Sequence, residues 1–542
     1  MNILTDCIRS DAEYRHLLLA ISEQRRARNP LPIVVAGLCD GATDAAYAAL
    51  AEDIRAKKSS SPILLVCSEE KECVRLTGLL RQFGLSAEFY MTRDLNFYNI
   101  VASHEYEHER LKVLSMIIHS TVDVVVTTPD AAISYTVPPS EFISSVIKLE
   151  YDKTSVETDV LERSLLNAGY VRAEMVDAPG QFAKRGGIID IYPPYAEFTD
   201  INDERLYGAY PMRLELFGDE IDRMEIFDAA TQRMTVTLNS VEIPPAREIL
   251  LDGEKKKTLR GAVEAQWKKS RDERAKLEMI SELAAIDGGL ELNFVDKYLT
   301  LIYPERVCLL DYLSGVPCVL IRNTASCADR LRASSWHMEQ TVEELLENGT
   351  ISAKYTDYSK PASAFDVFCE QNPVLHFDSF GQGMSGKKLG AMFTFRTKHM
   401  VSYAENYQLL CEDIDGYVKA RYKVILLAEN ENSAKNLCGY LCDKGYRAMI
   451  ETDKGDFIWS NLPVGTVLVV FRQAIRGYEL ASSRTVILST NSDSRDISAG
   501  ASGKLRTSKK KKSAAERIMS YNDLTVGDFV VHEIHEIGRA HV

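Results

Sequence analysis

Short apolar runs alternate with amphipathic stretches along residues 1–145. The apolar runs lie at 33–36, 63–67 and 122–127. Helix-like stretches follow the first two runs, at 45–56 and 69–83. Alternating strands and helices are typical of a parallel sheet with helices on its faces. We therefore expect residues 1–145 to fold as an α/β structure.

The pattern changes between residues 146 and 239. Strand-like runs follow one another closely there, at 146–151, 171–176, 187–192, 212–217 and 221–227. One helical stretch, 156–168, lies among them, and Gly218-Asp219 between the last two runs favours a hairpin turn. Strands this close in sequence predict a small α+β domain with an antiparallel sheet.

A second α/β pattern occupies residues 348–490. It follows a polar, helix-rich stretch at 253–290 and two apolar runs, 299–303 and 307–310. The expected helices are 407–419 and 433–442, and the expected strands are 424–428, 467–471 and 485–488. The later part of the chain therefore predicts another parallel sheet.

Two segments at the end of the chain differ from the rest. Residues 491–520 are rich in Ser and Gly and contain the run Lys509–Lys512, which favours a solvated linker over a weak contact with a phosphate backbone. Residues 521–542 begin as a strand, but about twenty residues cannot bury a core. We therefore expect the chain to be truncated inside a new β domain.

Charge and composition narrow the class of protein. The chain has 542 residues, with 64 Lys and Arg against 78 Asp and Glu, a formal charge of −14, which is unlike a protein that coats nucleic acid. The longest apolar runs are far shorter than a membrane-spanning helix, and the first residues lack a signal-peptide core. The eleven cysteines form no disulfide or zinc pattern. These features indicate a cytoplasmic protein with buried thiols and no membrane contact.

A phosphate-binding loop is expected where the first strand ends, but its chemistry is defective. A nucleotide motor needs Gly-x4-Gly-Lys-Ser/Thr between a strand and a helix. Here Gly37 and Gly41 lie in the loop and Thr43 follows, but the first Gly of the motif is missing, since Ala36 stands at its position. Ala42 replaces the lysine, and Asp40 brings negative charge to the phosphate position. The sequence predicts a degenerate loop that keeps the fold and has lost nucleotide hydrolysis.

No other segment supplies the missing chemistry. Residues 381–388 have suitable Gly and Lys spacing, but Lys388 replaces the hydroxyl that binds Mg²⁺, so a flexible basic loop is favoured. The acidic pair Asp219-Glu220 lies in the predicted hairpin turn. We therefore assign no catalytic residue, no metal and no cofactor, and expect the chain itself not to be an enzyme.

The most specific stretch of the sequence lies inside the predicted α+β domain. It reads GQFAKRGGIIDIYPP at 180–194 and PMRLELFGDEID at 211–222, followed by Phe227-Asp228 and by TQR at 231–233. This stretch resembles the UvrA-binding module shared by UvrB and the bacterial transcription-repair-coupling factors.

Three features make the chain more similar to the coupling factors than to UvrB. The loop lysine is missing, residues 472–479 (RQAIRGYE) resemble the third domain of the coupling factors, and residues 521–533 (YNDLTVGDFVVHE) resemble the start of their CarD-like, RNA polymerase-binding domain. One departure is His535-Glu536-Ile537-Gly538, where the family has His-Gly-Ile-Gly.

The resemblance implies an α/β multidomain architecture. Residues 1–145 and 240–347 would be two parts of one UvrB-like domain, a degenerate P-loop-type parallel sheet that is split by the UvrA-binding α+β domain at 146–239. A third α/β domain at 348–490, the basic linker at 491–520 and a truncated CarD-like domain at 521–542 would follow.

The resemblance also implies a function in transcription-coupled nucleotide excision repair. The full-length family is an ATP- and Mg²⁺-dependent DNA translocase that displaces stalled RNA polymerase and recruits UvrA. In this chain the motor, which makes the main contact with double-stranded DNA, would be absent, and the polymerase-binding domain incomplete. Because the family's C-terminal region masks the UvrA site, we hypothesise that the site is permanently open here.

The family's UvrA contacts match Arg185, Arg213 and Phe217. Residues 212–217 read as a strand in which Arg213, Glu215 and Phe217 share the face opposite the core. An arginine beside an exposed aromatic ring is the usual composition of an interface hot spot. Alternatively, the arginines pair with Glu215 or Asp190, and Phe217 caps the core of the hairpin.

Two other classes of function remain open from the sequence. A UvrB-like incision subunit or an ATP-dependent helicase would bind nucleotide at Gly41-Ala42-Thr43. A non-catalytic DNA-binding scaffold would use Lys509–Lys512 and would bind any duplex in a salt-sensitive manner.

Overall fold

A computed structural model describes residues 2–56, 61–98, 103–378, 388–404, 406–451, 462–471, 475–490, 529–532 and 536–539. The chain forms two compact units, Met1–Ala501 and Ser502–Val542. The first unit contains three sheets, and the second contains one pair of strands among its described residues. The sequence-based expectation that the chain contains several α/β parts is therefore confirmed.

The first sheet has seven strands, and every pairing in it is parallel, as the sequence pattern predicts. Its spatial order is β16-β1-β15-β14-β2-β4-β3. The strands are β1 Ile33–Ala36, β2 Ile63–Val66, β3 Ala87–Tyr90, β4 Val124–Thr127, β14 Val319–Arg322, β15 Val374–Phe377 and β16 Ala391–Thr394. Strands β15 and β16 belong to this sheet although they lie beyond residue 347, where the sequence analysis ended this part of the chain.

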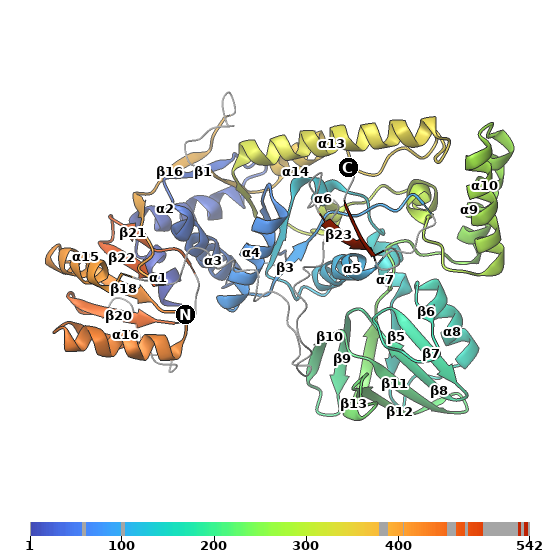
Figure 1. Cartoon of the computed structure of the whole chain (residues 1–542), viewed down its shortest axis with the longest axis horizontal. Coiled ribbons are helices and arrows are strands. Elements are labelled where there is room, and N and C mark those ends of the chain that lie inside the picture. The colour runs from blue at the N-terminus through green and yellow to red at the C-terminus, as the bar shows by residue number, and fades with distance from the viewer. Residues whose placement is uncertain are drawn as a thin grey trace. The chain divides into compact units, whose positions relative to one another are not determined.

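Helices cover both faces of this sheet (Figure 1). Successive strand residues alternate between two apolar cores, so that Leu65 and Val126 pack on one face while Leu64 and Val125 pack on the other. The helices are α1 Ile3–Arg9, α2 Ala12–Gln24, α3 Asp40–Ala56, α4 Glu70–Gln82, α5 Glu105–Ile118, α6 Pro129–Ile133, α7 Pro139–Ser145, α13 Thr324–Glu347 and α14 Ser363–Gln371.

A helical segment connects the second and first sheets. Helices α9 Gly253–Lys269 and α10 Glu273–Gly288 pack against each other as a hairpin. The apolar runs predicted after them form short helical turns, η1 Val295–Tyr298, α11 Leu299–Ile302 and α12 Leu309–Tyr312.

The second sheet is the predicted α+β domain. Its strands are β5 Ile147–Glu150, β6 Val171–Arg172, β7 Gln181–Arg185, β8 Ile188–Tyr192, β9 Ala196–Asp200, β10 Arg205–Gly208, β11 Met212–Phe217, β12 Glu220–Phe227 and β13 Met234–Ile243. All pairings except β6–β7 are antiparallel. Helix α8, Thr158–Asn167, packs Leu161 and Leu165 into the core on one face (Figure 1).

The predicted hairpin turn is present in this domain. Strands β11 and β12 pair in antiparallel register around Gly218, whose φ of 64° favours glycine. The first and last strands of the domain, β5 and β13, also pair, with Ile147 opposite Ile243. The chain therefore enters and leaves this domain at neighbouring points.

The third sheet has the order β17-β21-β22-β18-β20-β19. Its strands are β17 Thr397–His399, β18 Lys423–Leu427, β19 Arg447–Ile450, β20 Thr466–Val470, β21 Tyr478–Leu480 and β22 Thr485–Ser489, and its helices are α15 Tyr407–Lys419 and α16 Glu431–Asp443. Strands β18, β19, β20 and β22 are parallel, as predicted.

One apolar core is shared by the first and third sheets. It contains Val35 of β1, Ala45 of α3 and Ile8 of α1 together with Ile425 of β18 and Ile487 of β22. The opposite face of the third sheet packs against α15 and α16 through a separate cluster. The two α/β parts of the chain are therefore joined by continuous packing.

Several expectations concern residues outside the described ranges. These are the loop at 381–387, the linker at 491–520 with Lys509–Lys512, and most of the predicted CarD-like segment. Within 521–542 the described strands β23 Phe529–His532 and β24 Glu536–Arg539 pair in antiparallel fashion. In the described ranges, we find no helix long and apolar enough to span a bilayer.

The eleven cysteines all lie in the described ranges and form no disulfide there, but not all of them are buried. Six are buried, as the sequence analysis expected of all of them: Cys7, Cys67, Cys73, Cys308, Cys318 and Cys327. Four others are half-buried and Cys442 is exposed, because α16 turns that side chain away from the core.

Candidate functional site

The three predicted contact residues lie on one face of the second sheet. Across β7, β8 and β11, Arg185 lies opposite Ile188, and Arg213 lies opposite Asp190. Residues directly opposite in a sheet point to the same face, and so do every second residue along a strand. Phe217 therefore projects from the same face as both arginines, away from the core under α8.

Arg213 is held in place by three neighbours. Its Nε and Nη2 donate hydrogen bonds to Asp190 Oδ1 at 2.6 Å and Oδ2 at 2.9 Å, and Nη2 donates to Gln232 Oε1 at 3.1 Å. The guanidinium lies 5.0 Å from the centre of the Phe227 ring. The hydrogen bond to Asp190 raises the pKa of the Arg213 guanidinium, which stays charged.

Arg185 and Phe217 are more exposed. The Arg185 side chain is 54% exposed, and its Nη2 lies 3.7 Å from Asp190 Oδ2. Phe217 is 82% exposed and therefore does not cap the hairpin core. The alternative of arginines paired with a carboxylate holds in part, because Asp190 is close to both, but the exposed ring has no such structural explanation.

A small apolar cluster packs on the same face of the sheet as the two arginines. It contains Val176, Ala183 and Phe227, with Tyr192 packed against it. These residues come from the segment before β7 and from β7, β8 and β12. Arg185 and Arg213 themselves lie on strands β7 and β11, and not on a loop.

Sequence reasoning missed two residues of this surface. Ile188 is 38% exposed and lies between Arg185 and Glu215 in the strand register. Ile188 and Asp190 are two residues apart on β8 and therefore share a face, and this strand period could have predicted the position of Ile188. Gln232 has a left-handed backbone, with φ of 57°, in the turn before β13, and no local pattern points to its contact with Arg213.

The predicted degenerate loop connects β1 to α3 and is closely packed. Gly37 has a φ of 79°, and a Cβ atom there would lie 2.1 Å from the carbonyl oxygen of Phe395. A Cβ atom on Gly41 would lie 2.0 Å from the carbonyl oxygen of Arg476. Backbone from β16–β17 and from the segment before β21 therefore fills the space over both glycines.

The polar groups of this loop are bonded within the protein. Asp40 forms ion pairs with Arg322 at 3.0 Å and with Arg476 at 2.8 Å. The backbone N–H of Cys39 donates to Thr397 Oγ1 at 2.8 Å, and Thr43 Oγ1 donates to the carbonyl of Cys39 at 3.0 Å. Ala42 is buried.

The charges around this loop are the reverse of those in a nucleotide motor. A motor places a lysine in the loop and an acidic Mg²⁺ ligand on a nearby strand. Here the loop carries Asp40, and β14 of the same sheet ends in Arg322, which reaches Asp40. That the loop has lost nucleotide hydrolysis stays a prediction, and these contacts support it.

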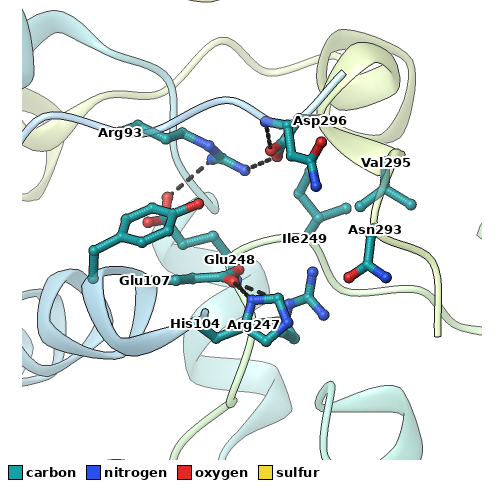
Figure 2. Close-up of a pocket in the computed structure, with 11 residues that line it drawn as sticks. Arg93, His104, Glu107, Arg247, Glu248, Ile249, Asn293, Val295 and Asp296 are labelled. Carbon is teal, nitrogen blue, oxygen red and sulfur yellow. Dashed lines mark hydrogen bonds and ion pairs between the residues drawn. The ribbon is translucent and has the colours of Figure 1, made fainter. Parts of the chain in front are cut away.

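A buried charge network joins α5 to the segment that leaves the second sheet (Figure 2). Arg93 bridges Glu248 at 3.0 Å and Asp296 at 2.6 Å, and Arg110 reaches Glu248 at 2.5 Å. Arg247 pairs with Glu107 of α5 at 3.0 Å. The network is charge-compensated and anchors residues 246–249, so we interpret the small pocket that it lines as structural.

Titration in this network depends on burial and on near neighbours. Burial opposes ionisation of Glu107, but Arg247 and His104 outweigh it and hold the pKa of Glu107 well below its usual range. Burial lowers the pKa of His108 to about 4. Burial also acts to lower the pKa of His104, but hydrogen bonds to Glu107 and Glu291 raise it overall.

Comparison with known protein families finds a match to the domain that carries this surface. Residues 147–249 match the family described as "UvrB interaction domain", and these bounds coincide with strands β5 to β13 and the segment up to the charge network. The second sheet thus coincides with the part of the chain that is similar to a UvrB interaction domain.

Curated relatives extend the likeness over most of the chain. A transcription-repair-coupling factor of Bacillus subtilis (strain 168) is 27% identical over 527 residues, which cover 93% of this chain and 42% of the relative. Those of Staphylococcus epidermidis (RP62A) and Staphylococcus haemolyticus (JCSC1435) are 27% identical over 393 residues and 23% identical over 553 residues. The chain is thus similar to these transcription-repair-coupling factors and spans less than half of their length.

Proposed function

We propose that this chain is a recruitment module of transcription-coupled nucleotide excision repair, and that its second sheet binds UvrA through Arg185, Arg213 and Phe217. The observation that carries the proposal is the exposed Phe217 ring on the same face as Arg185 and the hydrogen-bonded Arg213, in a domain that matches the UvrB interaction domain. Exposed aromatic and arginine side chains are the residue types that dominate binding energy at interfaces.

The wider role that we propose for the chain is supported by the name of its relatives. A coupling factor that recruits UvrA at a stalled RNA polymerase connects transcription to repair. Polymerase binding, DNA translocation and ATP hydrolysis are proposed for a full-length relative and not for the residues of this chain. The contacts of Asp40, Arg322 and Arg476 at the degenerate loop support a scaffold in place of a motor here.

The test is binding of purified UvrA to the chain and to an Arg213→Ala, Phe217→Ala double variant. We expect micromolar or tighter binding by the unchanged chain. Truncating central anchors costs on the order of 2 kcal/mol or more, or roughly thirtyfold in affinity, so the double variant should lose most binding. Isothermal calorimetry would measure both affinities.

A matched control comes from the far side of the same domain. Arg205 of β10 and Ile201 in the preceding turn are an exposed arginine and an exposed apolar residue away from the proposed surface. The Arg205→Ala, Ile201→Ala variant should bind UvrA normally. Absent binding by the unchanged chain, or equal loss in both variants, would contradict the proposal.

A further inference from the structure

We infer that Asp190 is a positioning residue of the UvrA-binding surface: it orients Arg213 and draws Arg185 beside it without touching the partner. The inference rests on the proposed function and concerns how that surface is built. It starts from the place of Asp190 in the sheet, where it lies directly opposite Arg213 on β11 and Ala183 on β7.

Asp190 is too deeply buried to meet a partner protein. It is 2% exposed, whereas the arginines above it are 18% and 54% exposed at their side chains. An unpaired carboxylate at such a depth would be strongly unfavourable. The two hydrogen bonds from Arg213 compensate its charge, and they do so in the two-point geometry that fixes the plane of a guanidinium.

The remaining contacts of Arg213 complete this orientation. Gln232 accepts a hydrogen bond from Nη2, and the Phe227 ring lies under the guanidinium. Asp190 and Gln232 thus engage Nε and Nη2. Among the described residues, no hydrogen-bond acceptor contacts Nη1, so its two N–H groups are available to a partner.

This arrangement also defines what the partner must offer. The exposed Arg185 guanidinium and the available Nη1 of Arg213 place positively charged N–H donors on this face. Phe217 and Ile188 add exposed apolar area beside that charge. The matching surface on the partner is an apolar pocket bordered by a carboxylate or by backbone carbonyl groups.

A double-mutant cycle separates positioning from simple stability. UvrA binding would be measured for the full chain and for Asp190→Asn, Arg213→Ala and the combined variant. Loss of a hydrogen bond to a charged group predicts about tenfold weaker binding for Asp190→Asn. Because Asp190 acts mainly through Arg213 and only through a 3.7 Å contact on Arg185, the same change should weaken binding much less once Arg213 is already alanine.

The matched control is another carboxylate that holds two cations in this domain. Glu162 accepts from Lys184 at 2.9 Å and from Arg172 at 2.8 Å, on the α8 side of the sheet. Glu162→Gln should leave UvrA binding unchanged. Urea unfolding of every variant, run in parallel, would correct each affinity for the folded fraction.

A second variant keeps the inference testable if Asp190→Asn does not fold. Arg213→Lys retains the charge but loses the two-point geometry, and we expect about tenfold weaker binding from it as well. Unchanged binding by Arg213→Lys, or independent effects of Asp190→Asn and Arg213→Ala, would overturn the positioning role. Failure of the unchanged chain to bind UvrA would instead overturn the proposed function.

Discussion

The pKa values of two histidines on neighbouring turns at the start of α5 are shifted in opposite directions within one charge network. His108 has a pKa lowered to about 4 by burial, while His104 has its pKa raised by Glu107 and Glu291 despite its own burial. His104 is therefore stabilising when protonated, and its contribution is lost as the pH rises through its raised pKa. His108 is accommodated as the neutral form and resists protonation.

We predict that acidification destabilises the chain through His108. Between pH 6.5 and 4 the unfolded chain binds a proton at this histidine and the folded chain does not, so stability falls as the pH falls through that window. The full effect is on the order of 3 kcal/mol. His104 is protonated in both the folded and the unfolded chain over most of this window, so its contribution to the free energy of unfolding changes little there.

The measurement is urea unfolding at pH 7.5 and pH 5 for the unchanged chain and for His108→Gln. The variant should lose less stability on acidification than the unchanged chain does. His16→Gln, at an exposed position of α2, serves as the control and should retain the full pH dependence. Equal acid sensitivity in all three proteins would contradict the assignment.

Some residue contacts could be inferred from the sequence, and others depend on the folded register. Arg213 and Phe217 alternate with Met212 and Leu214, so their shared face follows from the strand period alone. The exposed side of Ile188 and the contact of Gln232 with Arg213 require the pairing of β8 with β11 and a left-handed turn residue. Neither feature leaves a local mark in sequence.

At the scale of elements, the loop between β1 and α3 packs closely against two backbone segments that are distant in the sequence. Gly41 has an ordinary helical backbone, so only the 2.0 Å approach to the carbonyl of Arg476 excludes a larger residue. We predict that Gly41→Ala lowers the free energy of unfolding by roughly 1–3 kcal/mol, as overpacking does.

A second glycine in a helix provides the control. Gly439 lies inside α16, and a Cβ atom there would meet nothing within 4 Å. Gly439→Ala should therefore stabilise the chain by about 1 kcal/mol through helix propensity. Chemical denaturation would compare the two variants, and an unaffected Gly41→Ala protein would mean that the loop and Arg476 separate readily.

The elements themselves were predictable where their partners are close in the chain. The hairpin β11–β12 and helix α8 follow from local turn and periodicity signals. Strand β3, with the sequence AEFY, is only four residues long and is interrupted by Glu88, so no continuous apolar run marks it. The membership of β15 and β16 in the first sheet depends on parallel pairing with β1, a partner more than 300 residues away, which local patterns do not encode.

At the scale of the whole molecule, packing divides the first unit differently from sequence order. The first and third sheets share one core, whereas the second sheet has its own. We predict that Leu427→Ala, in the shared core on β18, raises amide hydrogen exchange in β1 and α3 as well as in the third sheet. Buried leucine truncation costs about 2–5 kcal/mol, enough to change exchange rates measurably.

The matched variant is Leu214→Ala in the core of the second sheet, where the leucine is equally buried. Faster exchange should stay within β5 to β13 in that protein. Hydrogen exchange followed by mass spectrometry would map both responses. A Leu427→Ala effect confined to residues 397–489 would show that the two α/β parts unfold independently.

The pairing of Ile147 with Ile243 has a consequence for the history and the engineering of this fold. Because the domain's two ends leave its sheet as neighbours, the host chain needs only a narrow gap to accept it, as domain insertion requires. Such a cassette can be acquired, lost or exchanged between lineages without rearranging the host. The same geometry makes residues 147–249, which include the buried core residue Ala246, a suitable unit to transplant into an unrelated scaffold.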